Sequence, residues 1–301
     1  MRVLVTGAAG FVGQRLLARL QEAGDEVYGL RMTSEELAGN LAGQLVGDVE
    51  DLEWLRGALH DVRPHAVIHL AALSDVAASW KHLDRYFSVN VLGTENLLEA
   101  VPETTRVVVA SSAEVYGKVR PEELPVAEDR PLRPTTPYAL TKAAAERLAV
   151  RHRAIVVRSF NLVGPGQDAR FALPSFAEQL RGIKNGDAAP VLKVGNLSAA
   201  RDFVHVDDAA DAYRLLAEKG EPGHCYNLAS GTAVVLRDAL DRLIATAGVD
   251  VSLVQDPERL RPSDVPVIAG DASALRELGW QPRRGLDQAI RDLWLSLDDS
   301  E

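Results

Sequence analysis

The sequence predicts an α/β protein built on a doubly wound parallel sheet. Short apolar segments typical of strands alternate with amphipathic segments typical of helices along most of the chain. The opening stretch, MRVLVTGAAGFVGQRLLARLQEAGDEVYGL, reads as a strand, a glycine-rich turn, a helix and a second strand. This βαβ order brings two parallel strands side by side. The chain has 301 residues, 47% of them hydrophobic, which is enough for a large core in one or two domains.

The glycines after the first strand predict a dinucleotide site. Gly7 permits a tight turn, Gly10 lets the backbone approach a pyrophosphate, and Gly13 lets the helix lie close to the sheet. Phe11 and Val12 begin the helix, whose N-terminal N–H groups would face the phosphates. The spacing is GxxGxxG rather than GxGxxG, but the strand before it and the helix after it supply the context that such a site requires.

The ends of the second and third strands bear on which dinucleotide binds. A dinucleotide fold usually offers an acid to the adenosine ribose at the end of the second strand, whereas this strand is followed by Arg31. A guanidinium suits a 2′-phosphate, so NADP(H) is favoured, with NAD(H) as the alternative if Arg31 only faces water. Asp48 could accept a hydrogen bond from the adenine amino group, or cap a helix predicted over 50–59. Val49 lies beside it in the same expected cofactor site.

Composition excludes several kinds of function. A net charge of −10 without any basic run argues against a nucleic-acid partner. The single cysteine, Cys225, is predicted to be a core thiol, so the chain can form neither a disulfide framework nor a thiolate metal site. His65 and His69 have no partner at ligand spacing, and we expect no metal. No charged leader precedes the first strand, and no segment approaches the roughly 18 apolar residues of a membrane span, so we expect a cytoplasmic protein without a membrane partner.

Two central segments are expected to shape the cofactor site. The strand in RPHAVIHLAAL ends in Leu70, Ala71 and Ala72, which would let a cofactor pass close over the strand end, or would only pack within the sheet. The helix predicted over 87–101 carries Asn90 between two valines. A buried amide forms hydrogen bonds, so Asn90 is either structural or shapes the cofactor site.

The β-branched strand in TTRVVVASS ends in two serines, at the edge where ligands of open parallel sheets bind. Ser112 is placed to hydrogen-bond a substrate oxygen, whereas Ser111 is expected only to satisfy the turn. The alternative for each is an ordinary loop serine. Glu114 lies two residues further and is either an acid or base that reaches the substrate or a solvated turn carboxylate.

Tyr138 and Lys142 predict acid–base chemistry on a carbonyl. They lie four residues apart in PTTPYALTKAAAERL, so a helix places the phenol and the ammonium on one face. A free phenol has a pKa of about 10, and a nearby cation favours its ionised form. The alternative is an ordinary solvated helix face.

Taken together, these segments resemble the extended short-chain dehydrogenase/reductase family, the nucleotide-sugar epimerases, dehydratases and reductases. The resemblance covers the whole chain. The segments that carry it are TGAAGFVG, Asp48, HLAA at 69–72, the Asn90 helix, SSAEVYG at 111–117, YALTK at 138–142, RSFNLVGPGQ at 158–167, RDFVHVDDAADAY at 201–213 and YNLASG at 226–231.

Within the family, the tail around RPS at 261–263 looks most like the enzymes of GDP-mannose and GDP-6-deoxyhexose metabolism. The compact length and the SSAEVYG turn are more similar to the GDP-4-keto-6-deoxy-D-mannose reductases, which form GDP-rhamnose, than to the longer GDP-mannose 4,6-dehydratases. The dehydratases usually carry threonine where this chain has Ser112, but Glu114 stands where they have a glutamate base. Dehydration therefore stays open.

The resemblance implies a particular architecture. Residues 1–162 and 203–227 would form a Rossmann dinucleotide-binding domain, and residues 163–202 and 228–301 a smaller, discontinuous substrate domain. A ligand cleft would lie between them. Family members commonly dimerise through two helices per subunit, here those at 90–100 and 138–150, although the apolar side of the second could equally face the sheet.

The resemblance also implies a reaction, the NAD(P)H-dependent reduction of GDP-4-keto-6-deoxy-D-mannose to GDP-D-rhamnose. Tyr138 would protonate the alkoxide, Ser112 would polarise the carbonyl, and Lys142 would hold the nicotinamide ribose and lower the phenol pKa. The alternatives are a 4,6-dehydratase with Glu114 as its base, a 4-epimerase with tightly bound NAD(P), and, more remotely, a non-catalytic dinucleotide-sensing protein.

Arginines are expected to bind the substrate diphosphate, because a guanidinium matches phosphate oxygens. Arg201 and Arg261 are the candidates, and the alternative for Arg201 is an ion pair with Asp202 or Asp207. Two further candidates for the substrate site are Asn161, which could offer an amide to the diphosphate, and Lys193, which either lines the base pocket or is simply exposed.

Overall fold

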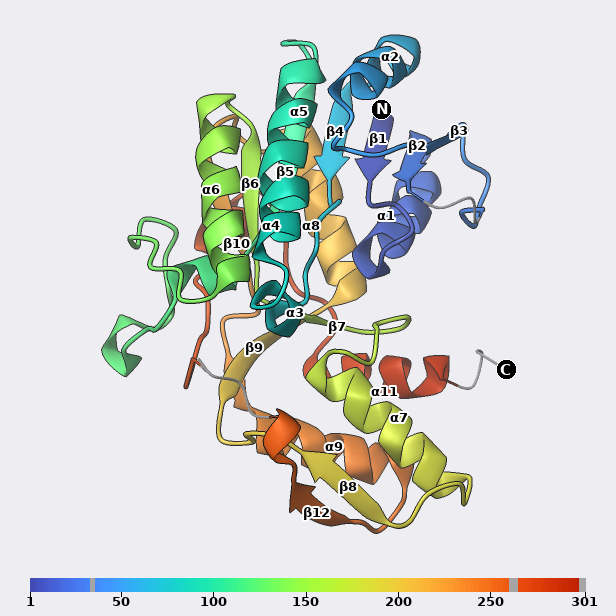
Figure 1. The fold of residues 1–301 in the computed structure, drawn as a ribbon, viewed down its shortest axis with the longest axis vertical. Coiled ribbons are helices and arrows are strands. Elements are labelled where there is room, and N and C mark those ends of the chain that lie inside the picture. The colour runs from blue at the N-terminus through green and yellow to red at the C-terminus, as the bar shows by residue number, and fades with distance from the viewer. Residues whose placement is uncertain (33–35, 260–264, 298–301) are drawn as a thin grey trace.

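The computed structural model describes residues 1–32, 36–259 and 265–297 (Figure 1). Within these residues, a seven-stranded sheet has the order β3-β2-β1-β4-β5-β6-β10, and every pairing in it is parallel. The predicted doubly wound parallel sheet is confirmed. Its strands are β1 Arg2–Thr6, β2 Glu26–Arg31, β3 Gly43–Val46, β4 Ala66–His69, β5 Arg106–Ser112, β6 Ile155–Ser159 and β10 Cys225–Leu228.

The strand order reverses at the centre of this sheet. β1 pairs with β2 on one side and with β4 on the other. Both central strands are apolar and buried over most of their length, as expected for strands covered on both faces. Ligands of open α/β sheets bind beside the carboxyl ends of strands at such a reversal. The glycine turn follows β1 at this point, and the HLAA segment begins with His69, the last residue of β4.

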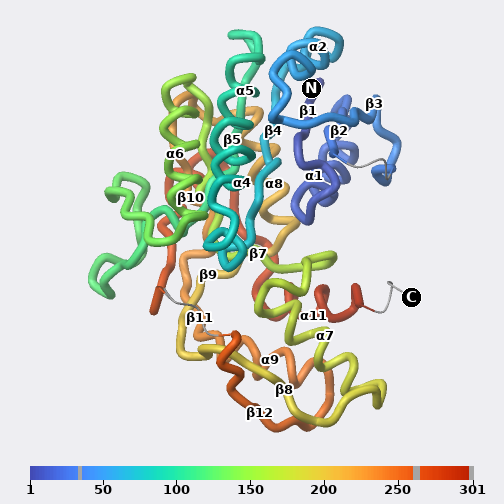
Figure 2. Tube along the Cα trace, in the orientation of Figure 1, coloured from blue at the N-terminus to red at the C-terminus, as the bar shows by residue number. Residues whose placement is uncertain are grey.

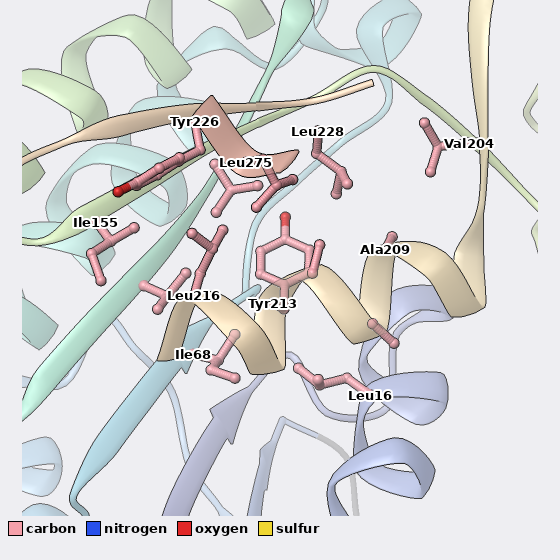
Figure 3. Packing of buried hydrophobic residues seen from close by; sticks show 14 of the residues in the cluster. Leu16, Ile68, Ile155, Val204, Ala209, Tyr213, Leu216, Tyr226, Leu228 and Leu275 are labelled. Atoms are coloured by element: carbon pink, nitrogen blue, oxygen red, sulfur yellow. The ribbon is translucent and has the colours of Figure 1, made fainter. Parts of the chain in front are cut away.

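Helices cover both faces of the sheet. On one face, α1 Phe11–Glu22 and α8 Val206–Lys219 pack against each other and against the strands. Figure 3 shows Tyr213 of α8 among Leu16, Ile68 and Leu275, all of them buried. On the other face lie α2 Leu52–Val62, α5 Gly93–Ala100 and α6 Pro137–Arg151, over two further apolar clusters.

The smaller part of the chain has its own apolar core, formed by segments distant in sequence. Figure 2 shows α7 Ala172–Lys184, α9 Leu236–Ala247 and α11 Leu286–Ser296 together below the main sheet. Beside them lie a three-stranded sheet, β11-β9-β7, and a two-stranded one, β12-β8. These strands are β7 Asn161–Val163, β8 Val191–Val194, β9 Ala200–His205, β11 Ala233–Val235 and β12 Ser252–Gln255. β9 crosses the predicted domain boundary at 202/203 and leads directly into α8; the division itself stays a prediction.

Two predicted helices differ from those observed. The helix expected over 50–59 is α2, and Asp51 caps it by accepting from the backbone N–H of Trp54 at 3.0 Å. Capping by Asp48 was therefore wrong, because its carboxylate accepts from the N–H of Glu50, before the helix starts. The helix expected over 87–101 consists of α4 Leu83–Phe87, a π-helical turn over Ser88–Leu92, and α5. Such π-helical turns often occur at functional sites. In the described part of the chain, none of the helices is both long enough and apolar enough to cross a membrane.

Candidate active site at the carboxyl end of the sheet

The glycine turn forms a tight cradle between β1 and α1. Gly7 has a φ of +67°, and a Cβ there would lie 2.7 Å from the backbone nitrogen of Ala71. A Cβ on Gly13 would lie 2.3 Å from the Gly7 carbonyl oxygen. Gly10 precedes α1, which has no side-chain cap and no acidic residue in its first turn. The positive end of the helix is therefore open to an anion, and the cradle fits the pyrophosphate of a dinucleotide.

A buried hydrogen-bond chain supports the floor of this cradle. The Thr6 hydroxyl accepts from the N–H of Ala71 at 3.2 Å and lies 2.7 Å from His69 Nδ1. His69 Nε2 lies 3.1 Å from the Thr94 hydroxyl, which donates to the Asn90 carbonyl oxygen. Because Thr94 uses its hydrogen there, Nε2–H must donate to Thr94, leaving Nδ1 to accept from Thr6. Burial lowers the pKa of His69 to about 3, so the ring is neutral.

Asn90 connects these hydrogen bonds to α6, the helix that carries Tyr138 and Lys142. Its side chain holds both the N–H and the C=O of Leu73 and donates to the Thr141 hydroxyl. Thr141 donates in turn to the carbonyl oxygen of Tyr138. Asn90 thus fixes the loop after β4 relative to the start of α6, which is the structural role predicted for it. Whether Asn90 also shapes the cofactor site stays a prediction.

The sequence around Tyr138 makes a well-defined helix start. Thr136 caps α6 by accepting from the N–H of Ala139 at 3.1 Å, and Pro137 occupies the first helical position. The N–H of Tyr138 donates to the Ser79 hydroxyl, so this first turn is also anchored to α3 Val76–Ser79. Tyr138 and Lys142 are only 8% and 7% exposed, which excludes the solvated helix face.

The Tyr138 phenol and the Ser112 hydroxyl are hydrogen-bonded at the end of β5. Burial raises the pKa of Tyr138, this hydrogen bond works in the opposite direction, and the nearby Glu114 carboxylate raises the pKa further. Ser112 also caps the short 3₁₀ helix Ala113–Tyr116 by accepting from the N–H of Glu114. The structure therefore groups Ser112, Glu114 and Tyr138 at one place.

The lowering of the phenol pKa by Lys142 stays a prediction; the largest effect on Tyr138 is burial, which raises its pKa. The Nζ of Lys142 donates to the Ala110 carbonyl oxygen at 2.8 Å. Burial lowers the pKa of Lys142 itself to about 8, and the Glu146 carboxylate opposes that change. The prediction that Ser111 only satisfies the turn was wrong, because its hydroxyl donates to Glu146. The signal in the sequence that could have indicated this partner is the spacing of four residues from Lys142 to Glu146.

The candidate residues for the adenosine end lie at the ends of β2 and β3. Arg31 ends β2, is largely buried, and donates to the side-chain oxygen of Gln44 at 3.2 Å. It is therefore not an arginine that simply faces water. Asp48 follows β3 and is half-buried, and Val49 beside it is buried. These positions agree with a role at the adenosine, which stays a prediction.

The carboxylates considered as partners of Arg201 are engaged elsewhere. Asp202 is fully buried and accepts from the Ser230 hydroxyl and three backbone N–H groups. Asp207 pairs with Arg15 at 2.6 Å. Arg201 donates to the carbonyl oxygens of Ala200 and Val265. Its binding of a diphosphate stays a prediction.

The other substrate candidates lie in the smaller part of the chain. Asn161 is exposed at the start of β7. Lys193 is exposed on β8, where it lines a surface hollow with Glu178 and Ile183 of α7. Figure 1 shows β8 in the lower part of the molecule, apart from β5 and α6. Arg261 lies outside the described residues. In the described ranges, no three His, Cys, Asp or Glu side chains are grouped so that they could hold a metal ion.

Comparison with known proteins adds independent information. A family model described as GDP-mannose 4,6 dehydratase matches residues 4–293. The GDP-6-deoxy-D-mannose reductase of Pseudomonas aeruginosa is 34% identical over 300 residues, covering 96% of this chain and 95% of that protein. The UDP-glucose 4-epimerase of Streptomyces lividans is 32% identical over 320 residues, covering 97% of this chain and 95% of that protein.

Two solved structures share the fold over the full length of both chains. The structure of RMD from Pseudomonas aeruginosa complexed with NADPH has a TM-score of 0.88 at 32% identity, with 100% of each chain covered. The Thermus thermophilus UDP-glucose 4-epimerase in complex with NAD has a TM-score of 0.89 at 30% identity, also with 100% of each chain covered.

Proposed function

This chain belongs to the GDP-mannose 4,6-dehydratase family, within the extended short-chain dehydrogenases/reductases, and from that premise we propose that it reduces a 4-keto-6-deoxy nucleotide sugar. It is a nucleotide-sugar oxidoreductase that works with a nicotinamide dinucleotide. The substrate best supported by its relatives is GDP-4-keto-6-deoxy-D-mannose, which would be reduced to GDP-D-rhamnose.

The buried group of Ser112, Tyr138 and Lys142 carries this proposal. The Ser112 hydroxyl donates to the sugar C4 carbonyl oxygen, and Tyr138 delivers its proton to that oxygen as the alcohol forms. When bound, the reduced nicotinamide supplies the hydride to C4. Lys142 binds the nicotinamide ribose, and its positive charge stabilises the phenolate that remains once Tyr138 has delivered its proton. The small exposure of Tyr138 and Lys142 keeps water from the reacting oxygen.

We expect NADPH to be the preferred cofactor because of Arg31. A guanidinium at the end of β2 would pair with the 2′-phosphate of NADPH, whereas NADH offers it no comparable anion. Arg31→Ala should weaken NADPH binding at least tenfold and leave NADH binding within about twofold, measured by fluorescence titration at matched ionic strength. Equal losses for both cofactors would contradict this assignment.

A second candidate activity rests on Glu114. Its carboxylate lies close enough to Tyr138 to influence the phenol, which is where a base for water elimination would be needed. A GDP-mannose 4,6-dehydratase would use it between two hydride transfers. A 4-epimerase would need only Ser112, Tyr138 and Lys142 with a retained NAD(P).

Absorbance at 340 nm distinguishes these activities. With NADPH and GDP-4-keto-6-deoxy-D-mannose, the reductase consumes one NADPH for each sugar reduced. Formation of a keto sugar from GDP-mannose without net change in absorbance would establish the dehydratase instead. Interconversion of UDP-glucose and UDP-galactose without net NADPH loss would establish the epimerase.

We also infer a homodimer formed by α5 and α6, which pack side by side on the outside of the sheet (Figure 1). Large aliphatic side chains are exposed there: Leu92 is 59% exposed at the end of the π-helical turn before α5, and Leu140 and Val150 are 47% and 41% exposed on α6. Burying such side chains against a second copy would be favourable.

A further inference from the structure

Three consecutive residues at the end of β5 are tied to three residues spaced four apart on α6. The Ala110 carbonyl oxygen accepts from Lys142, the Ser111 hydroxyl donates to Glu146, and the Ser112 hydroxyl bonds Tyr138. On a helix, residues four apart share one face, so the phenol, the ammonium and the carboxylate form one row. Tyr138 and Lys142 have roles in the proposed reaction, whereas Glu146, the third residue of the row, has not been given one.

Glu146 is held in place by a buried arginine. It is 2% exposed, and Arg158 of β6 donates to both of its oxygens, at 2.9 and 3.2 Å. Arg158 is fixed in turn by the Tyr116 hydroxyl at 3.0 Å and the Glu128 carbonyl oxygen at 2.7 Å, with its guanidinium over the Tyr116 ring. Arg158 and Ser111 thus hold the Glu146 carboxylate from two sides, through a buried ion pair and a hydrogen bond.

Lys142 needs such a neighbour. It is an ammonium in a nearly closed site, where burial favours the neutral amine. Its one described hydrogen bond, to the Ala110 carbonyl oxygen, leaves two of its three donors to other partners. A fixed carboxylate one helical turn away stabilises the charged form.

We propose that Glu146 is a positioning residue for the reaction, which keeps Lys142 protonated and in place beside Tyr138. This rests on the proposed role of Lys142 in binding the nicotinamide ribose and assisting proton transfer. The direction of the Glu146 effect on the pKa of Lys142 agrees, since it opposes the effect of burial.

Other charged or titratable groups face this pair, and they define what a pH profile would report. They are Tyr138 on the same helix, Arg158 on β6, His69 on β4, Tyr116 on the 3₁₀ helix after β5, Glu128 in the following loop and Cys225 on β10. His69 has a pKa of about 3 and is therefore neutral in the alkaline range, and burial raises the pKa values of Tyr116 and Cys225. An alkaline limb caused by the ionisation of Lys142 should shift when residue 146 is changed. This dependence distinguishes it from limbs caused by the other groups.

The test compares Glu146→Gln with Asp208→Asn. Asp208 is also a buried carboxylate in an ion pair, with Arg284 at 2.6 Å, but it lies on α8, on the opposite face of the sheet from α6. NADPH affinity is measured by fluorescence between pH 5 and pH 10, together with the pH profile of kcat/KM. Glu146→Gln should move the alkaline limb of both down by about one to three pH units, the usual effect of losing an adjacent opposite charge. Asp208→Asn should lose stability without moving either limb, and Glu146→Asp should restore most of the parent profile.

The inference fails if the limbs of Glu146→Gln coincide with those of the parent, because Glu146 would then act only in folding. If Glu146→Gln does not fold, the double variant Glu146→Gln/Arg158→Gln removes the buried guanidinium that would otherwise lose its partner, and it is measured instead with the same expected direction of shift. The affinity profile needs no sugar. It therefore tests Glu146 even if the parent protein does not reduce the proposed keto sugar, and that second result would count against the proposed function alone.

Discussion

At the scale of single residues, Tyr138 combines a protected phenol with one specific partner. Burial raises the pKa of the phenol and favours the protonated form, whereas the hydrogen bond with Ser112 lowers the pKa and favours release of the proton. Tyr138→Phe removes the proton donor but keeps the ring, which packs edge-on against Tyr86. We expect kcat/KM to fall about 10²- to 10⁴-fold, the usual contribution of general acid–base catalysis, with little change in Tm.

The control for this variant is Tyr28→Phe, since the Tyr28 hydroxyl on β2 donates to Glu26 at the exposed start of that strand. It should keep the parent activity. A Tyr138→Phe protein that turned over at the parent rate would exclude every catalytic role proposed for this phenol.

His69 makes the stability of the protein depend on pH. Its folded-state pKa of about 3 lies below the value of about 6.5 expected when unfolded. Between these values the unfolded chain binds a proton that the folded chain does not, so the contribution is present above pH 6.5 and is lost as the pH falls. The loss amounts to about 2 kcal/mol at pH 5.

Urea unfolding at pH 7.5 and pH 5 measures this effect. The parent should lose stability on acidification, and His69→Asn should lose about 2 kcal/mol less over the same interval, whatever its stability at pH 7.5. His60→Asn is the control, because His60 is exposed on α2 and should leave the slope unchanged. Equal slopes in all three proteins would show that His69 is not kept neutral by the fold.

At the scale of elements, the contact between α1 and the glycine turn depends on the absence of a side chain. Gly13→Ala would place Cβ 2.3 Å from the Gly7 carbonyl oxygen, so α1 or the turn must move. We expect a loss of about 1–3 kcal/mol in stability, as for other overpacked sites, and at least a tenfold loss of NADPH affinity.

Gly57→Ala is the matched control. Gly57 lies inside α2, and a Cβ there would meet no atom within 4 Å. This variant should gain about 0.5–1 kcal/mol from helix propensity and bind NADPH like the parent. Thermal unfolding and fluorescence titration measure both quantities, and a Gly13→Ala protein with unchanged affinity would contradict the cradle.

The elements that could be predicted from the sequence are those with local signals. The glycine turn, the apolar strands and the YxxxK spacing each reflect geometry within a few residues, and the structure has β1, α1, β5 and α6 where they were expected. Capping was one of two roles considered for Asp48, and Asp51, three residues later, offers the same side chain and caps α2 instead. Local pattern alone could not distinguish the two.

Interactions between distant segments were not predictable in this way. Ser111 was assigned to its own turn because its partner, Glu146, is 35 residues away. Likewise, the pKa of Tyr138 is raised mainly by burial, and burial depends on how much of the chain covers α6. Hydrophobic periodicity does not report that. The substrate candidates show the same limit, since Lys193 lies on a strand of the second core.

At the scale of the whole molecule, neither of the two apolar cores is formed by one continuous segment of the chain. β9 belongs to the three-stranded sheet, while α8, which continues from it, packs on α1 and the main sheet. Arg201 and Asp202 are neighbours on that strand, with Asp202 fixing the turn at Ser230. If Arg201 binds the substrate as predicted, the substrate would be held by a strand that continues directly into α8 on the main sheet.

The proposed dimer is the prediction that belongs to the whole molecule. Leu140 is exposed on the outer side of α6, so Leu140→Glu would place a charge within the proposed contact of two copies. Leu295→Glu introduces the same change at a similarly exposed leucine on α11, outside that contact. Because burying an unpaired carboxylate is costly, only the first variant should dissociate. In sedimentation equilibrium, the parent and Leu295→Glu should have twice the chain mass and Leu140→Glu the mass of one chain. A monomeric parent, or dissociation of both variants alike, would show that α5 and α6 do not form the proposed interface.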